Sequence, residues 1–296
     1  MALKVTKEAD PIEVTRMTVT LYAAPGLGKT STAFTADNPL LLDFDHGAYR
    51  SAFRKDTVQV ERWADVADIS ADDVSAYNTI VVDTVGRALD ALTTHLIAEN
   101  PKFKGYGGAL SLQGYGALKS TFGTWLKQLS GFGKDIVLLA HMDEQRNGDD
   151  VTERLDIQGA TKNEVHKQSD AMGRIFVENR QRVLTFDPDA GGFGKNPAGL
   201  DPIHVPHFAS SPMFLADLIK QMKDTLNSKT EGQRKAMQEL ADWSAKFDDA
   251  ESAEDFNALR GECSDCGDNV KRLLMAKAKA KGVAFDRDAG EFKAAA

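Results

Sequence analysis

The sequence predicts an α/β domain with a mainly parallel sheet, followed by a small helical domain. Short apolar runs of strand length recur through the first half of the chain, and several end in a polar residue, as strands buried on both faces of a parallel sheet do. A glycine-bearing turn separates the first such run from a helical segment. Beyond residue 226 charged helix formers dominate. We therefore expect an N-terminal extension at 1–15, a core at 16–226 and a helical domain at 227–296.

The composition of the chain limits the classes of function that it can have. The chain of 296 residues has a formal net charge of −8, which argues against indiscriminate nucleic-acid binding by its whole surface but leaves room for a local basic patch. Without a long apolar run or a signal peptide, we expect a cytoplasmic protein that does not enter a membrane. Cys263 and Cys266 form a lone CxxC pair, so we expect two free thiols and no zinc site.

The stretch from Leu21 to Thr30 has the phosphate-binding pattern GxxxxGK[ST], with Ala23 in place of the first glycine. In such a loop backbone N–H groups surround a phosphate, and glycine is needed where a Cβ would collide or where φ is positive. Lys29 would contact the outer phosphates and Thr30 would bind Mg²⁺. An ordinary strand-to-helix turn is the alternative. The predicted ATP-binding residues are Ala24, Pro25, Gly26, Leu27, Gly28, Lys29, Thr30 and Ser31.

Carboxylates follow two further apolar runs. Asp83 ends the later run, where a carboxylate holds Mg²⁺ in P-loop hydrolases, so Thr30 and Asp83 are the predicted metal ligands. Thr84 follows it, whereas AAA+ proteins usually place their catalytic glutamate there. The water-activating group must then come from elsewhere. Asp43 and Asp45 follow the earlier run, and strand ends of a parallel sheet share one edge. We expect Asp45 to be the general base, with Asp43 as its competitor.

A lysine-rich stretch with interleaved aromatic residues and no acidic residue occupies 101–134. Its glycine-rich first part is expected to be a flexible loop. There Lys102 and Lys104 flank Phe103 and lie close to Tyr106, a combination that suits phosphate neutralisation and base stacking on single-stranded DNA. A solvated connecting loop is the alternative. Aromatic residues on the helix that follows are expected in the core.

The next segments complete the core. An apolar run ends in His141, and the polar stretch 143–162 is expected to be too hydrophilic to pack. Residues 174–177 and 181–186 are predicted to form two strands. A loop at 191–199 follows and contains Lys195.

In this order the motifs resemble those of the RecA-like ATPases, over roughly residues 16–200. That family follows its P-loop with a strand ending Asp-x-Glu-His, a Walker B strand ending Asp-Ser, a basic loop and helix, a strand ending in a polar sensor, and a Lys-Asn-Lys segment. More narrowly, the chain is similar to phage-encoded RecA paralogues that act as single-strand annealing proteins. The corresponding stretches are Asp43-Phe44-Asp45-His46, Asp83-Thr84, 101–134, His141 and Lys195-Asn196. Asp45, His141 and Pro197 depart from the family's Glu, Gln and second Lys.

The resemblance implies roles for two more residues. His141 would sense the γ-phosphate, and Lys195 would reach the nucleotide of a neighbouring subunit. The implied catalytic residues are Lys29, Asp45, Asp83, His141 and Lys195.

The implied activity is Mg²⁺-dependent ATP hydrolysis by a homo-oligomeric ring or filament that anneals single-stranded DNA in phage-type recombination. The C-terminal helices would offer a surface to a host or phage replication protein. Two alternatives remain open. One is a P-loop motor or helicase loader acting on a protein or on duplex DNA. The other is a scaffold that uses ATP as a clamp with negligible turnover.

Overall fold

The computed structural model describes residues 3, 5–6, 12–51, 53–147, 150–157, 161–189, 192–286 and 289–294. Most of the predicted N-terminal extension at 1–15 therefore lies outside the described residues. Internal contacts define a core unit, Val14–Leu226, and a second unit that includes the chain from Asn227 onward.

The core unit is built on one sheet. Within the described residues, nine strands form it in the order β3-β2-β4-β5-β1-β7-β8-β9, with β6 paired to β5. The neighbours from β3 to β7 pair in parallel, whereas β8, β9 and β6 pair antiparallel. The predicted α/β class with a mainly parallel sheet is confirmed. The strands are β1 Thr18–Ala23, β2 Pro39–Asp43, β3 Thr57–Gln59, β4 Thr79–Asp83, β5 Asp135–Asn147, β6 Asp150–Leu155, β7 Ala171–Glu178, β8 Gln181–Thr185 and β9 Ile203–His204.

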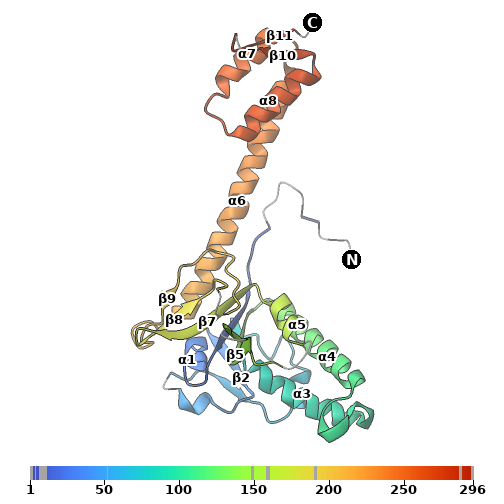
Figure 1. Cartoon of the computed structure of the whole chain (residues 1–296), viewed down its shortest axis with the longest axis vertical. Helices are drawn as coiled ribbons and strands as arrows, with labels where there is room; N and C mark the ends of the chain where they lie inside the picture. The colour runs from blue at the N-terminus through green and yellow to red at the C-terminus, as the bar shows by residue number, and fades with distance from the viewer. Residues whose placement is uncertain are drawn as a thin grey trace. The chain divides into compact units, whose positions relative to one another are not determined.

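Helices cover both faces of this sheet (Figure 1). Helices α3, α4 and α5 pack on one face, and α1 and the beginning of α6 pack on the other. The helices are α1 Lys29–Ala33, α2 Ala64–Ala67, α3 Val85–Glu99, α4 Leu112–Gly131, α5 Thr161–Gln168 and α6 Phe214–Asp249, and short 3-10 turns are η1 Ala48–Arg50, η2 Pro101–Phe103 and η3 Tyr106–Gly108.

The apolar runs form strands because both of their faces are buried. In β4, Ile80 and Val82 join the cluster that contains Leu92 of α3, whereas Val81 joins the opposite cluster with Leu215 of α6. Successive side chains of a strand point to opposite faces, so a run without polar alternation suits a sheet with helices on both sides. This packing fixes the carboxyl ends of the central strands at one edge.

The prediction for 143–162 is wrong. Strand β5 continues past His141 to Asn147 and forms an antiparallel hairpin with β6, and helix α5 follows. Leu155 and Val165 are buried and anchor this polar segment to the core. The sequence pattern does not predict this hairpin, because backbone pairing in a hairpin needs few apolar side chains. Residues 148–149 and 158–160 lie outside the described residues.

The second unit combines helices with a hairpin. The end of α6 packs with α7 Ala253–Glu262, α8 Asp268–Ala280 and the strands β10 Val283–Asp286 and β11 Glu291–Ala294. Its buried core includes Phe247, Phe256 and Phe292. The predicted C-terminal helices are confirmed, and the structure adds a hairpin in which β10 and β11 pair after α8.

Two negative findings concern the described residues only. Both cysteines are free thiols there, Cys263 buried and Cys266 partly exposed. None of the described helices has both the length and the apolar character needed to cross a bilayer.

Candidate functional site

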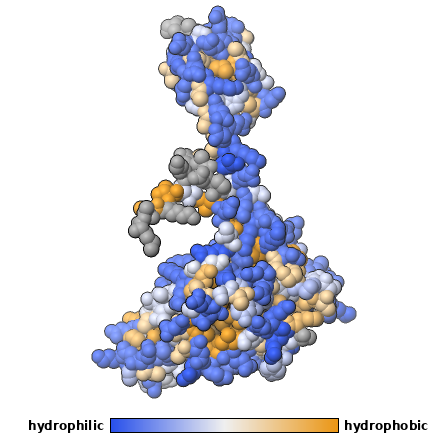
Figure 2. Space-filling view, turned by 180° about the vertical axis from the view of Figure 1, so that it is seen from behind, coloured by the Kyte–Doolittle hydropathy of each residue, from blue (hydrophilic) through white to orange (hydrophobic). Residues whose placement is uncertain are grey.

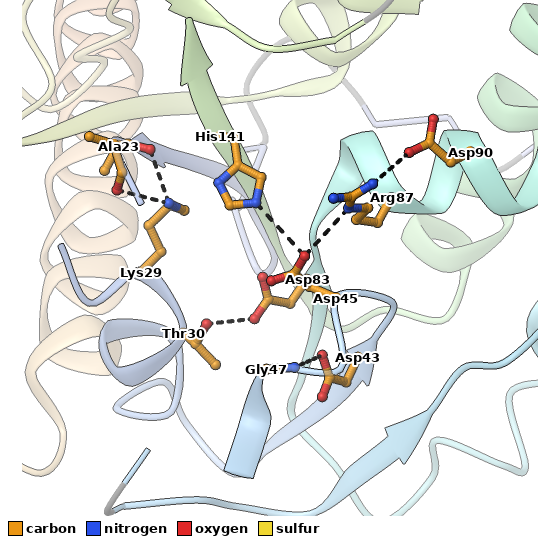
Figure 3. Close-up of polar contacts among 11 residues, drawn as sticks. Ala23, Lys29, Thr30, Asp43, Asp45, Gly47, Asp83, Arg87, Asp90 and His141 are labelled. Atoms are coloured by element: carbon orange, nitrogen blue, oxygen red, sulfur yellow. Dashed lines mark hydrogen bonds and ion pairs between the residues drawn. The ribbon is translucent and has the colours of Figure 1, made fainter. Parts of the chain in front are cut away.

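The sheet brings most of the predicted nucleotide-site residues together at the carboxyl ends of β1, β2 and β4 (Figure 3). Strand register pairs Asp43 with Asp83 and Ala23 with His141, so the ends of β2, β4 and β1 lie beside the middle of β5. A cleft of about 250 Å³ opens at this edge. The predicted residues that line it are Pro25, Gly26, Gly28, Lys29, Thr30, Ser31, Asp45, Asp83 and His141.

The backbone of the phosphate-binding loop has the predicted glycine conformations. Gly26 has φ of 81° and Gly28 has φ of 86°, which side chains with a Cβ rarely adopt. Ala23 replaces the first glycine of the pattern without strain, because it is the last residue of β1 and its side chain lies in the core. Leu27, although within the loop, packs against the same core cluster.

Lys29 is buried at the base of the cleft, with 6% of its surface exposed. Its ammonium donates to the carbonyl oxygens of Ala23 at 3.0 Å and Ala24 at 3.2 Å. Burial lowers the pKa of Lys29, and the nearby carboxylates of Asp83 and Asp45 oppose this shift. Charged phosphate oxygens form stronger hydrogen bonds than neutral carbonyls, so this ammonium can exchange its partners for a phosphate.

Thr30 and Asp83 are in direct contact. The Thr30 hydroxyl donates to Oδ2 of Asp83 at 2.6 Å. Burial raises the pKa of Asp83 to about 6, against the opposing effect of the Thr30 hydrogen bond. An adjacent hydroxyl and carboxylate fit Mg²⁺, which is commonly held by one or two carboxylates together with substrate phosphates. Among the described residues, no group of three or more His, Cys, Asp or Glu side chains is arranged to hold a metal ion.

The structure separates the roles of the two neighbouring aspartates. Asp43 is fully buried, and its carboxylate accepts hydrogen bonds from the backbone N–H groups of Gly47 at 3.1 Å and Ala48 at 3.0 Å. Those bonds fix the turn after β2 and leave Asp43 out of the cleft lining. Asp45 lies in the cleft wall. Of the two candidates for the general base, the geometry favours Asp45.

Asp45 pairs with Arg87 and lies near His141, both from other elements. Its Oδ1 atom lies 3.5 Å from Nε of Arg87 and 3.9 Å from Nε2 of His141. Arg87 is in the first turn of α3 and also pairs with Asp90 at 3.3 Å. The carboxylate of Asp45 is thus oriented within the cleft by contacts to one of its oxygens.

Two buried polar atoms in the cleft lining have no hydrogen-bond partner within the described structure. They are Nδ1 of His141 and Oγ1 of Thr84. Buried polar atoms are nearly always hydrogen-bonded, so this pair marks a place where a ligand or an ordered water belongs. Burial and the nearby Lys29 charge lower the pKa of His141, which keeps the imidazole neutral near pH 7.

Sequence reasoning missed three residues of the cleft. Gly47, Arg50 and Ser51 complete its lining together with Thr84, which directly follows Asp83. No motif marks the first three, because their proximity depends on how the turn after β2 folds back toward the P-loop.

Arg182 of β8 approaches the phosphate-binding loop from another strand. Its Nη1 atom donates to the Leu27 carbonyl at 3.4 Å and lies 2.5 Å from where a Cβ on Gly28 would be. Its guanidinium also stacks over Phe208 at 5.3 Å. Glycine at position 28 therefore allows both the positive φ and the close approach of the Arg182 guanidinium to the backbone.

Lys195 does not line the cleft. Its ammonium donates to the carbonyl oxygens of His166 and of Ser169, the latter at 2.7 Å. Its backbone also exchanges hydrogen bonds with Met172. These bonds engage Lys195 within its own chain, and its predicted reach into a neighbouring subunit stays a prediction.

The residues predicted to contact DNA lie on a separate surface loop. Lys102 and Lys104 are exposed, and Tyr106 is fully exposed at 103%. Phe103 is half-buried and packs against the core, which leaves less of its ring for stacking. The loop is also more ordered than expected, because backbone hydrogen bonds from Gly105 to Ala109 and from Ser111 to Phe103 close it. Its role in binding DNA stays a prediction.

Comparison with known proteins assigns the chain to a family. The chain matches the AAA_24 family, described as an AAA domain, over residues 15–198. It is similar to a solved structure of a prototypical ATPase from the type III secretion system of pathogenic bacteria, at 12% sequence identity and a TM-score of 0.38, over 54% of this chain and 51% of that ATPase. The chain thus spans about half the length of that ATPase. No curated protein matches it. Because the family match covers more than half of the chain, including the P-loop, β4 and His141, this protein belongs to the AAA_24 family of P-loop ATPases.

Proposed function

We propose that this protein is a Mg²⁺-dependent ATPase whose nucleotide state controls binding and annealing of single-stranded DNA. The observation that carries the proposal is the cleft itself, where a buried lysine, a hydroxyl–carboxylate pair and a separately held carboxylate surround one cavity. These are the groups that phosphoryl transfer to water needs. The orphaned atoms of His141 and Thr84 support a ligand in the same place.

Each residue then has a distinct task in hydrolysis. Lys29 and the loop amides would bind the phosphates, and Thr30 and Asp83 would hold the metal ion. Mg²⁺, when bound, neutralises charge on the phosphate oxygens. Asp45 accepts a proton from water as the water oxygen bonds to the γ-phosphorus and the bond to the β,γ-bridging oxygen breaks, which yields ADP and phosphate.

The loop after α3 supports the DNA side of the proposal. Tyr106 presents a whole aromatic ring to solvent beside two lysines, and no acidic residue occurs in 101–134. Stacking of a base on such a ring and neutralisation of its phosphates are the usual means of binding single strands. Because backbone bonds already order the loop, less conformational entropy is lost on binding.

Helix α3 offers a physical link between cleft and loop. It begins immediately after Thr84, a residue of the cleft lining, and it ends at Glu99, just before η2. A γ-phosphate contact at Thr84 would therefore bias the position of the helix that supports Lys102 and Tyr106. Such a bias requires two positions of α3, one for each nucleotide state.

The carboxylate at 45 also favours a second candidate, the ATP-clamped scaffold with negligible turnover. Aspartate is one methylene shorter than glutamate, and Asp45 is already engaged by Arg87. Multiple-turnover ATP hydrolysis, measured for the wild type and for Lys29→Ala, separates the two candidates. Steady release of phosphate that Lys29→Ala abolishes supports the enzyme, whereas tight ATP binding without release supports the clamp.

The DNA proposal has its own test. ATP hydrolysis and mobility-shift binding are measured with a single-stranded oligonucleotide, with the matching duplex and without DNA. The proposal expects single strands to stimulate hydrolysis and to bind more tightly with a non-hydrolysable ATP analogue than with ADP. Stimulation by duplex alone would favour the motor or helicase-loader class, and no binding of either DNA would refute the DNA role.

A further inference from the structure

The C-terminal unit contains a groove that ATP chemistry does not use. It has a volume of about 630 Å³ and lies between α7, the turn that follows it, α8 and β10. Cys263, Leu274 and Phe285 contribute apolar surface to it, and all three also belong to or pack against the core of this unit. Met275 lies at its edge with 45% of its surface exposed. Figure 2 shows an apolar patch within the largely hydrophilic surface of this unit.

The charged groups of the groove are positive. Arg260 and Lys271 line it, and the described lining includes no aspartate or glutamate. Other lysines of the unit have acidic partners, such as Lys246 with Glu262 and Lys277 with Asp248. For Arg260 and Lys271, by contrast, the described residues provide no ion pair. In a chain with a net charge of −8, the lining of this groove thus carries two cations and no carboxylate.

Arg260 is held in place before any partner binds. Its guanidinium lies over the ring of Phe285 at 4.8 Å, and Nη1 donates to the carbonyl oxygen of Gly290. A planar guanidinium fixed in this way retains further donors for a carboxylate and loses little entropy when one binds.

We propose that this groove binds a short acidic peptide segment of a partner protein, with apolar side chains on its floor and carboxylates at Arg260 and Lys271. Charge complementarity identifies the carboxylates, and the apolar floor identifies the side chains between them. A nucleic-acid strand fits less well, because it needs a continuous cationic track and its backbone has no apolar groups for Leu274 and Met275.

The test uses the full-length protein and fluorescence anisotropy of labelled eight-residue peptides. The acidic probe alternates glutamate with leucine or phenylalanine, the basic probe replaces each glutamate by lysine, and a neutral probe replaces it by glutamine. The wild type is expected to bind the acidic probe at least tenfold more tightly than the other two. A single-stranded oligothymidylate and the unlabelled acidic peptide are then added as competitors in separate titrations. Displacement of the labelled acidic probe by the oligonucleotide but not by the unlabelled peptide would assign the groove to nucleic acid.

Charge reversal makes the test specific. The double variant Arg260→Glu with Lys271→Glu is expected to lose the acidic probe and to gain the basic one. Met275→Gln, which removes apolar surface without a change in charge, is expected to weaken binding of the acidic probe. The matched control reverses Arg272 and Lys279, two exposed cations of α8 outside the groove, and is expected to bind like the wild type. Unchanged selectivity in the groove variant, or equal binding of all three probes, would overturn the proposal. Helical content and melting temperature of each variant exclude misfolding, and ATP binding at the P-loop cleft of the core unit serves as a second check on the fold.

Discussion

The hydroxyl of Thr30 donates a 2.6 Å hydrogen bond to the carboxylate of Asp83, which joins the end of the phosphate-binding loop to the end of β4. The two residues lie on elements that are far apart in sequence, and strand β5 separates β4 from β1 in the sheet. Their contact places a hydroxyl and a carboxylate oxygen side by side at the cleft. It is the arrangement from which the proposed metal site follows.

Replacement of Asp83 by asparagine is expected to stabilise the ligand-free protein above pH 6. Burial raises the pKa of Asp83 from 3.8 to about 6, so its ionisation destabilises the fold as the pH rises through that interval. At 1.36 kcal/mol per pKa unit, ionisation of Asp83 lowers the free energy of unfolding by about 3 kcal/mol. Thermal melts from pH 7.5 down to 4 should show a higher melting temperature for Asp83→Asn at pH 7.5 and a difference that shrinks as the pH falls. A difference independent of pH would contradict the assignment.

Asp45→Asn is expected to lower kcat for ATP hydrolysis by about 100-fold or more, the usual contribution of a general base. Its melting temperature should change little, because Asp45 lies in the cleft wall rather than in a buried hydrogen-bonded turn. Asp43→Asn should show the opposite pattern, with a small change in kcat and a lower melting temperature. The reason is that the buried carboxylate of Asp43 accepts hydrogen bonds from two backbone N–H groups. Equal losses of kcat and stability in both variants would show that the two carboxylates have no separate roles.

Arg50→Ala is expected to raise KM for ATP about tenfold, because a guanidinium that lines the cleft can donate to phosphate oxygens, a charge-assisted bond of roughly 1.5 to 3 kcal/mol. Arg50→Lys should restore part of the loss. Arg62→Ala is the control, since Arg62 is exposed, pairs with Asp65 and lies outside the cleft. Steady-state kinetics would count against the role if Arg50→Ala and Arg62→Ala behaved alike.

Tyr106→Ala is expected to weaken binding of single-stranded DNA about tenfold, since base stacking on an aromatic side chain contributes roughly 1 to 3 kcal/mol. Tyr106→Phe retains the ring and should bind like the wild type. Hydrolysis without DNA should be the same in all three proteins, because Tyr106 is not part of the cleft lining. Equal DNA binding by the alanine variant would remove Tyr106 from the interface.

The sequence could predict the sheet and the convergence of Lys29, Asp83, Asp45 and His141. The last three lie at or just after the end of an apolar run, and Lys29 belongs to the glycine-bearing loop that follows another. Parallel pairing then requires those ends to meet at one edge. Separating Asp43 from Asp45 required coordinates, since both follow β2 and only tertiary structure shows which carboxylate the turn uses.

The cations around the cleft could not be predicted either. Arg50, Arg87 and Arg182 come from a turn, a helix and a distant strand, and none belongs to a motif. The β5–β6 hairpin could not be predicted from the sequence pattern either. Backbone pairing and a few buried side chains such as Leu155 stabilise it, and neither gives a regular apolar pattern.

The nucleotide and metal site is tested by calorimetric titration of the wild type and of Thr30→Ala with a slowly hydrolysed ATP analogue, with and without Mg²⁺. The wild type is expected to bind one nucleotide per chain, with an affinity that Mg²⁺ increases at least tenfold. In Thr30→Ala, Mg²⁺ is expected to leave the affinity for the nucleotide unchanged. Binding that is the same with and without Mg²⁺, or a Thr30→Ala variant that keeps the full Mg²⁺ effect, would contradict the proposed site.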